Sequence, residues 1–104
     1  MDFVLAYITT KDKGQAVAIG RALVEERLAA CVNIIDNMMS IYRWDGEINT
    51  DSEAVLIAKT SSHKFPALTE RVKQLHSYTC PCVVSMAITG GNQQYLDWLA
   101  GETG

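Results

Sequence analysis

The sequence lacks the features that direct a chain to nucleic acid, to a membrane or to secretion. It has no run of Lys and Arg and a formal net charge of -3, so it offers none of the basic surface expected of a nucleic-acid-binding protein. No stretch approaches the roughly 20 apolar residues of a membrane-spanning helix. Met1-Asp2 precedes only a short apolar run, Phe3 to Ile8, with no basic segment and no small-residue cleavage site. We therefore expect a cytoplasmic protein that binds neither nucleic acid nor a membrane.

Cysteine is scarce, and motifs of enzymes are missing. The three cysteines, Cys31, Cys80 and Cys82, are an odd number, and in the cytoplasm they would remain thiols. No nucleophile elbow, Walker-type loop or dinucleotide fingerprint occurs, so an enzyme is not expected. Hydrophobic residues make up 48% of the 104 residues, which indicates one folded domain, residues 1–104, that requires neither a disulfide nor a cofactor to fold.

The most informative segment is a long two-stranded ribbon around Trp44-Asp45-Gly46-Glu47. Its arms, 31–42 and 48–60, are rich in Val, Ile, Met, Tyr and Thr, and Asp-Gly is a strong hairpin signal. Strands usually run about five or six residues. Arms of this length are predicted to extend past the helices of one small subunit and to contact another partner.

The rest of the chain alternates strands and helices. A strand over 3–9 is followed by a helix with Thr10 or Asp12 as its N-cap. After the ribbon, Ser61-Ser62 opens a second helix with Pro66 near its first turn, where proline is tolerated. A last strand, 79–88, is interrupted early by Pro81, and a short helix capped by Asn92 follows.

The order βαββαβ with a central hairpin predicts an α+β fold, a ferredoxin-like split βαβ sandwich with an extended β-hairpin and a short C-terminal helix. Right-handed crossovers place both long helices on one face of the sheet. However, both alternating sets of the first strand are apolar: one is Phe3, Leu5 and Tyr7, and the other is Val4, Ala6 and Ile8. Because the helices cover only one face, the second face needs another cover, and self-association is the simplest one.

The residues resemble those of the CutA proteins, also called divalent-cation tolerance proteins, over nearly the full length. The landmarks are Leu28-Ala29-Ala30-Cys31-Val32-Asn33, Tyr42, Trp44, Gly46, Ile48, Glu53, Lys59-Thr60, His76, Tyr78, Pro81, Tyr95-Leu96 and Trp98. This resemblance implies a homotrimer, related in shape to PII-like signalling proteins, whose ribbons extend sheets across subunits. It also implies a role in the response to metal ions.

The resemblance is weakest where a metal site is expected. In the family a histidine and an acidic residue are thought to bind copper, together with a cysteine near the end of the first strand. Here His76 is retained, Cys82 replaces the acidic residue, and no cysteine precedes Ala30. The candidate ligands are therefore His76, Cys80 and Cys82, a set that suits copper or zinc. The alternative is that the cysteines are core residues and His76 is a helix C-terminal cation; Cys31 is expected in the core.

A second candidate site surrounds the ribbon. Tyr42, Arg43 and Trp44, with Lys59 and Tyr78, are candidates for a small-ligand cleft between subunits, or else for packing between ribbon arms. Glu53 and Asp51 are interpreted as a solvated or interfacial charge group. Three functions remain open: a trimeric metal-binding protein, a PII-like sensor of a small molecule, and a scaffold with no small-molecule site.

Overall fold

The computed structural model describes residues 1–104 and contains four strands and three α-helices. Their order is β1 (Phe3–Thr10), α1 (Lys13–Glu25), β2 (Cys31–Trp44), β3 (Glu47–Ser61), α2 (Phe65–Leu75), β4 (Val83–Ile88) and α3 (Gln93–Thr103), with a 3-10 turn at Ser62–Lys64. The strands form one antiparallel sheet in the order β2-β3-β1-β4. This is the predicted ferredoxin-like α+β arrangement.

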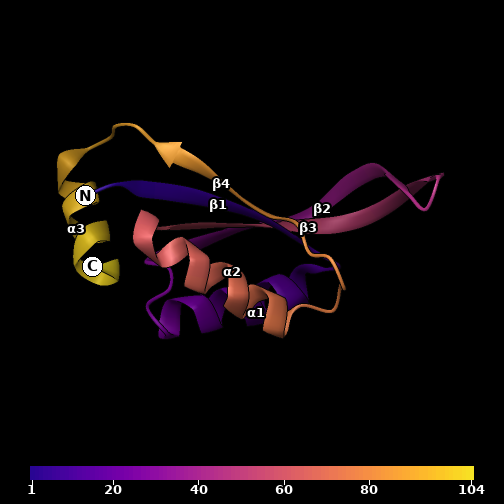
Figure 1. Ribbon diagram of the computed structural model, residues 1–104, viewed down its shortest axis with the longest axis horizontal. Coiled ribbons are helices and arrows are strands. Elements are labelled where there is room, and N and C mark those ends of the chain that lie inside the picture. Colours follow the sequence, from indigo (N-terminus) through magenta and orange to yellow (C-terminus); the bar gives the residue numbers. More distant parts are fainter.

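Helices α1 and α2 both lie against one face of the sheet (Figure 1). Side chains of β1 and β3 that point to that face, such as Ile8 and Leu56, are fully buried among apolar residues of the two helices. Asp12, rather than Thr10, is the N-cap of α1, because its carboxylate accepts a hydrogen bond from the backbone N–H of Gln15 at 2.8 Å. None of the helices is both long enough and apolar enough to cross a membrane.

The end of α1 shows an unusual backbone conformation. The N–H of Leu28 bonds to the carbonyl of Leu23, and the N–H of Arg27 bonds to that of Val24, which is a Schellman ending. Arg27 takes the left-handed position of this motif with φ 58°, where glycine is the usual residue.

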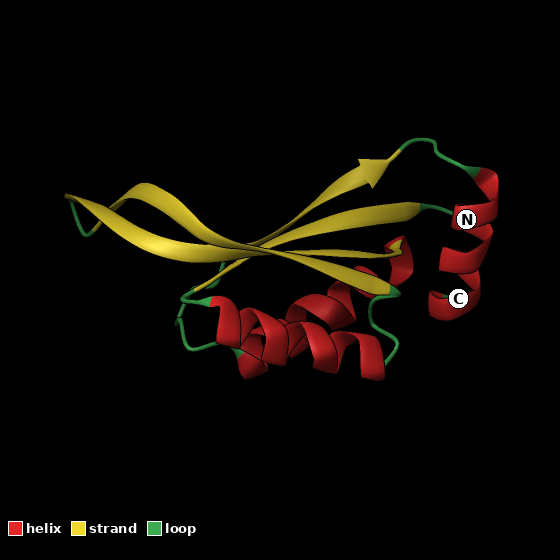
Figure 2. Cartoon of the chain, turned by 180° about the vertical axis from the view of Figure 1, so that it is seen from behind, coloured by secondary structure: helices red, strands yellow, loops and turns green.

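Strands β2 and β3 run on past the rest of the sheet as the predicted ribbon (Figure 2), and the molecule measures 45 × 24 × 22 Å. Asp45 and Gly46 both have positive φ, 51° and 78°, as a two-residue type I′ turn requires. A β-bulge between Ile35 and Met38 divides the ribbon from the body of the sheet, with Asn37 in the left-handed region at φ 59°.

No helix lies over the centre of the sheet face opposite α1 and α2 (Figure 2). Tyr7 pairs with Ile57 on one side and with Val84 on the other, so all three side chains point to this face. Val84 and Met86 remain 52% and 55% exposed. The expectation that both faces of the sheet are apolar is therefore confirmed for the single chain, and we call this surface the open face.

Two predictions of local structure are wrong. The last strand begins at Val83 rather than at residue 79, and residues 76–82 form an irregular loop before it; Pro81 in this loop has no N–H to contribute to a ladder. Cys31 is not a core residue, because its side chain is only half-buried and its sulfur lies 3.2 Å from the hydroxyl of Tyr95.

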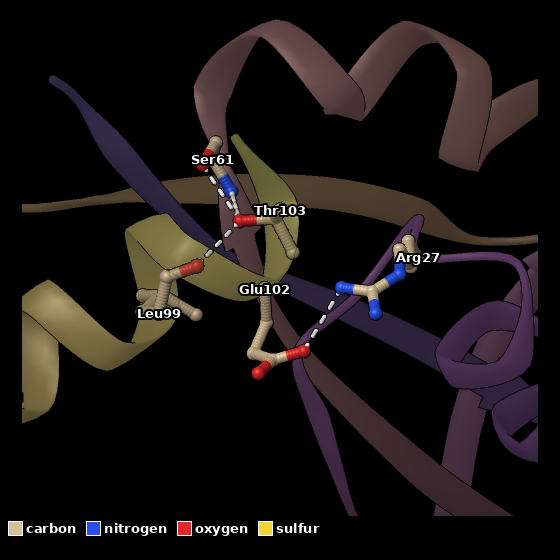
Figure 3. Close-up of polar contacts among 5 residues, drawn as sticks. All are labelled: Arg27, Ser61, Leu99, Glu102 and Thr103. Carbon is tan, nitrogen blue, oxygen red and sulfur yellow. Dashed lines mark hydrogen bonds and ion pairs between the residues drawn. The ribbon is translucent and has the colours of Figure 1, made fainter.

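Helix α3 lies at the end of the molecule opposite the ribbon tip (Figure 1). The hydroxyl oxygens of Ser61 and Thr103 are 2.7 Å apart, and Thr103 also donates to the carbonyl of Leu99 at 2.8 Å (Figure 3). Arg27 pairs with Glu102 at 3.1 Å in the same view. These contacts attach the C-terminal helix to β3 and to the end of α1.

Candidate functional site: a cleft at the base of the ribbon

A cavity of about 550 Å³ lies where the ribbon leaves the body of the sheet, and we call it the ribbon cleft. It contains six of the eight residues that the sequence singled out. The cleft is lined by Thr9, Ser40, Tyr42, Arg43, Trp44, Glu53, Tyr78, Thr79, Cys80 and Cys82. One wall is thus the ribbon, and the other is the 76–82 loop.

His76 holds the 76–82 loop in place instead of lining the cleft. Its Nδ1 accepts a hydrogen bond from the backbone N–H of Tyr78 at 3.0 Å, and its Nε2 lies 2.8 Å from the carbonyl oxygen of Thr9. A carbonyl can only accept, so Nε2 carries the proton and the imidazole is the neutral Nε2–H tautomer. The ring also packs on that of Tyr78, with centroids 4.5 Å apart. Both ring nitrogens of His76 are therefore engaged by the protein.

Glu53 and Tyr78 form the most buried polar contact of the cleft. The Tyr78 hydroxyl donates to Oε2 of Glu53 at 2.8 Å, and Glu53 is only 9% exposed. Burial raises the pKa of the Tyr78 phenol far above its usual value, and the hydrogen bond and negative charge of Glu53 raise it further. Tyr78 is consequently a neutral donor throughout the physiological range.

A second tyrosine and carboxylate lie on the ribbon side. The hydroxyl of Tyr42 donates to a carboxylate oxygen of Asp51. That hydrogen bond is the main reason that the pKa of Tyr42 is raised, with smaller contributions from desolvation and from the charges of Asp51 and Glu53. The two tyrosines therefore present neutral rings in a negatively charged environment.

The cleft also contains two thiols, which sequence reasoning placed either at a metal site or in the core. Cys80 and Cys82 are both exposed, so they are not core residues of this chain. Loss of water around the sulfur raises the pKa of Cys82, and the charges of Glu53 and Cys80 act in the same direction, whereas a hydrogen bond with Thr9 opposes them. A bound cation would reverse this tendency by favouring the thiolate.

The predicted set of three metal ligands is not assembled within one chain. No group of three or more His, Cys, Asp and Glu side chains is placed to hold a metal ion. His76 forms hydrogen bonds with two backbone groups and does not line the cleft. Among the lining side chains, Cys80 and Cys82 are accompanied by the carboxylate of Glu53. Thiolate sulfur suits soft or borderline ions, and this donor set matches copper or zinc in chemistry but is incomplete in number.

Lys59, which the sequence also suggested for this site, lies outside the ribbon cleft. Its ammonium donates to Oδ1 of Asn33 at 2.9 Å and is 5.7 Å from the centroid of the Tyr95 ring, near α3.

Sequence reasoning missed the roles of Glu53 and Thr9 in the cleft. The signal for Glu53 was its position two residues before Val55 in an apolar strand, which directs its carboxylate to the open face.

Comparison with known proteins gives a consistent family. The family model for the CutA1 divalent ion tolerance protein matches residues 4–102. A divalent-cation tolerance protein CutA of Thermus thermophilus is 55% identical over 97 residues, which are 93% of this chain and 94% of that protein. The chloroplastic protein CutA 1 of rice is 41% identical over 100 residues, which cover 96% of this chain but 56% of the rice protein.

Solved structures agree in fold. The divalent cation tolerance protein of Thermus thermophilus superposes with a TM-score of 0.96 at 52% identity, covering 98% of this chain and 99% of that one. The periplasmic divalent cation tolerance protein CutA of Archaeoglobus fulgidus gives a TM-score of 0.95 at 37% identity, with coverage of 98% and 99%. The likeness extends over the ribbon as well as the body of the sheet.

Proposed function

This chain belongs to the CutA1 divalent ion tolerance family, and on that premise we propose that it binds copper or zinc as part of a response to metal ions. The observation that supports the proposal is the presence of two thiols, Cys80 and Cys82, beside the carboxylate of Glu53 in one cleft. Sulfur ligands favour soft or borderline ions over Mg²⁺ and Ca²⁺, which prefer oxygen. In this proposal the protein is not an enzyme, and the metal ion is cargo or a signal that takes part in no reaction.

The side chains of one chain do not complete a metal coordination shell. Cys80 and Cys82 supply the sulfur ligands, and water, a second copy of the chain or a partner molecule completes the coordination. His76 joins the shell only if it gives up its bond to Thr9 or to Tyr78. We therefore assign His76 the task of positioning the loop that carries the two thiols.

We further propose that the protein is a cytoplasmic homotrimer of PII-like shape. The apolar open face and the projecting ribbon support self-association, because Val84, Met86 and Ile35 are each more than half exposed in the single chain. Related proteins carry periplasmic and chloroplastic in their names, so location varies among relatives. For this chain the cytoplasmic proposal is supported by the three free cysteines.

Calorimetric titration of the reduced protein with Cu(I) and with Zn²⁺ tests metal binding. Cys80→Ser and Cys82→Ser are each expected to weaken binding at least about tenfold. Cys31→Ser is the matched control, because Cys31 lies near Tyr95 and outside the cleft, and it should bind as the wild type does. Equal binding by all three variants, or no binding by the wild type, would contradict the proposal.

A small-ligand sensor is the second candidate function, and the ribbon cleft favours it. Its volume of about 550 Å³ is within the range of small-molecule sites and far exceeds the space that one ion needs. A thermal-shift screen of the metal-free protein with nucleotides, small anions and small cations tests this candidate. A rise in melting temperature that persists in the Cys80→Ser/Cys82→Ser double variant would distinguish it from metal binding.

A further inference from the structure

The ribbon cleft contains the buried carboxylate of Glu53, which forms no ion pair with a basic side chain of this chain. The ion pairs of the chain join Arg21 to Glu25, Arg27 to Glu102, Arg71 to Glu26 and Lys73 to Glu70. Neither Glu53 nor Asp51 is among them. The only side-chain hydrogen bonds to these two carboxylates come from neutral phenols, Tyr78 and Tyr42 respectively. A carboxylate as buried as Glu53 is costly unless a cation approaches it.

The pKa shifts of the two tyrosines agree with the absence of such an ion pair. The charges of Glu53 and Asp51 raise the pKa of both Tyr42 and Tyr78, and no Lys, Arg or His contributes in the opposite direction. Arg43 also borders the cleft, but it forms no ion pair with Glu53 or with Asp51. The carboxylate of Glu53 is therefore not neutralised by an ion pair within this chain.

Aromatic rings supply the rest of the lining. Tyr42, Trp44 and Tyr78 all border the cavity, and the first two remain 40% and 53% exposed. The face of an aromatic ring attracts a cation, most strongly one that is poorly hydrated, such as an alkylated ammonium. Hydrogen bonds from the two phenols to carboxylates enrich their rings in electrons and strengthen this attraction.

We propose that the ribbon cleft binds an organic ammonium ion, whose charge faces Glu53 and whose alkyl groups contact the rings of Tyr42, Trp44 and Tyr78. The inference rests on the small-ligand role proposed above and specifies the ligand class. A bare metal ion fits these features less well, because ring faces are not metal ligands and no set of three ligating side chains is assembled. An alkylammonium ion uses both the carboxylate and the rings, and it occupies more of the cavity.

The test uses choline as the probe and its neutral isostere, 3,3-dimethylbutan-1-ol, as the comparison. The chain has two tryptophans, Trp44 and Trp98, so a Trp98→Phe protein reports the cleft through the fluorescence of Trp44 alone. Choline is expected to change this fluorescence saturably, and the alcohol, which has the same shape without the charge, should bind at least about tenfold more weakly. Calorimetry on the unmodified chain checks the affinity independently.

Variants assign the effect to the cleft. Glu53→Gln keeps an acceptor for Tyr78 and removes the charge, so choline affinity should fall about tenfold or more. Trp44→Leu, tested by calorimetry, should weaken binding as well. Glu70→Gln is the control, because it removes an exposed carboxylate that pairs with Lys73 outside the cleft. All choline titrations are made on reduced, metal-free protein in the presence of a chelator, so a failure of metal binding and a failure of this proposal are separate results.

Three outcomes would overturn the inference. One is the absence of a saturable signal with choline up to about 10 mM. Another is equal binding of choline and the neutral alcohol, which would make the cleft merely apolar. The third is that Glu53→Gln leaves choline affinity unchanged; a change in oligomer mass of the same variant, measured by light scattering, would then indicate that Glu53 pairs with a basic side chain of a second copy.

Discussion

The Nε2 of His76 lies 2.8 Å from the carbonyl oxygen of Thr9, so the residue after α2 is tied to the end of β1 across 67 positions of sequence. Because Nδ1 also accepts from Tyr78, replacement of the ring leaves two part-buried backbone groups without partners. His76→Ala is expected to lower the free energy of unfolding by about 2 kcal/mol, measured by urea denaturation. His63→Ala is the control, since His63 is exposed; equal losses for both variants would contradict the assigned role.

Thr60 has a buried hydroxyl whose removal should raise the free energy of unfolding. Its side chain is fully buried, and its hydroxyl has no hydrogen-bond partner. Thr60→Val keeps the shape and removes the unpaired hydroxyl, so it should raise the free energy of unfolding by about 1 kcal/mol. Thr10 is equally buried, but its hydroxyl donates to the carbonyl of Asp12 at 2.8 Å. Thr10→Val should therefore destabilise the protein, and thermal unfolding of the pair tests both signs.

The fold could be predicted because local signals agree with each other. Asp45-Gly46 indicated the turn, and the two apolar sets of β1 indicated a sheet with a second face to cover. The cleft was predictable only in part. Tyr42, Trp44 and Tyr78 were recognised as aromatic candidates, whereas the position of Lys59 near Tyr95 depends on where α3 packs. Residues 79–82 of the loop were misread as strand because Val83 and Val84 follow them directly, and no local signal shows that His76 bonds to a distant carbonyl.

Arg27 tests the cost of a left-handed conformation at the end of α1. Arg27→Gly and Arg27→Ala both remove the exposed ion pair with Glu102, but only glycine adopts φ 58° without strain. The Gly variant should therefore be more stable than the Ala variant by about 1 kcal/mol. Chemical denaturation of the two proteins measures the difference directly, and an Ala variant of equal or greater stability would contradict this reading of the backbone.

The raised pKa of Tyr78 predicts how the stability of the protein changes at alkaline pH. Its pKa in the folded protein lies above the ordinary value of about 10 because the phenol is partly buried and bonded to Glu53. The folded state therefore holds this proton more tightly than the unfolded state, so the contribution is complete below about pH 10 and is lost as pH rises beyond it. The pKa of Tyr42 is raised as well, but the shift of Tyr78 is the larger one, so ultraviolet titration should show that Tyr78 ionises last. In Tyr78→Phe that late ionisation should be absent; if it persists, another tyrosine is responsible.

Leu56 and Ile57 are adjacent on β3 and point to opposite faces, which allows the proposed trimer to be tested separately from the core. Leu56 is fully buried beneath the helices, and Leu56→Asp should unfold the chain because an unpaired charge in the core costs several kcal/mol. Ile57 faces the open face beside Tyr7, so Ile57→Asp should leave a folded chain that no longer associates. Light scattering with gel filtration and circular dichroism distinguish these outcomes. A wild-type mass near that of one 11.5 kDa chain would reject the trimer, and an Ile57→Asp protein with unchanged mass would place the interface elsewhere.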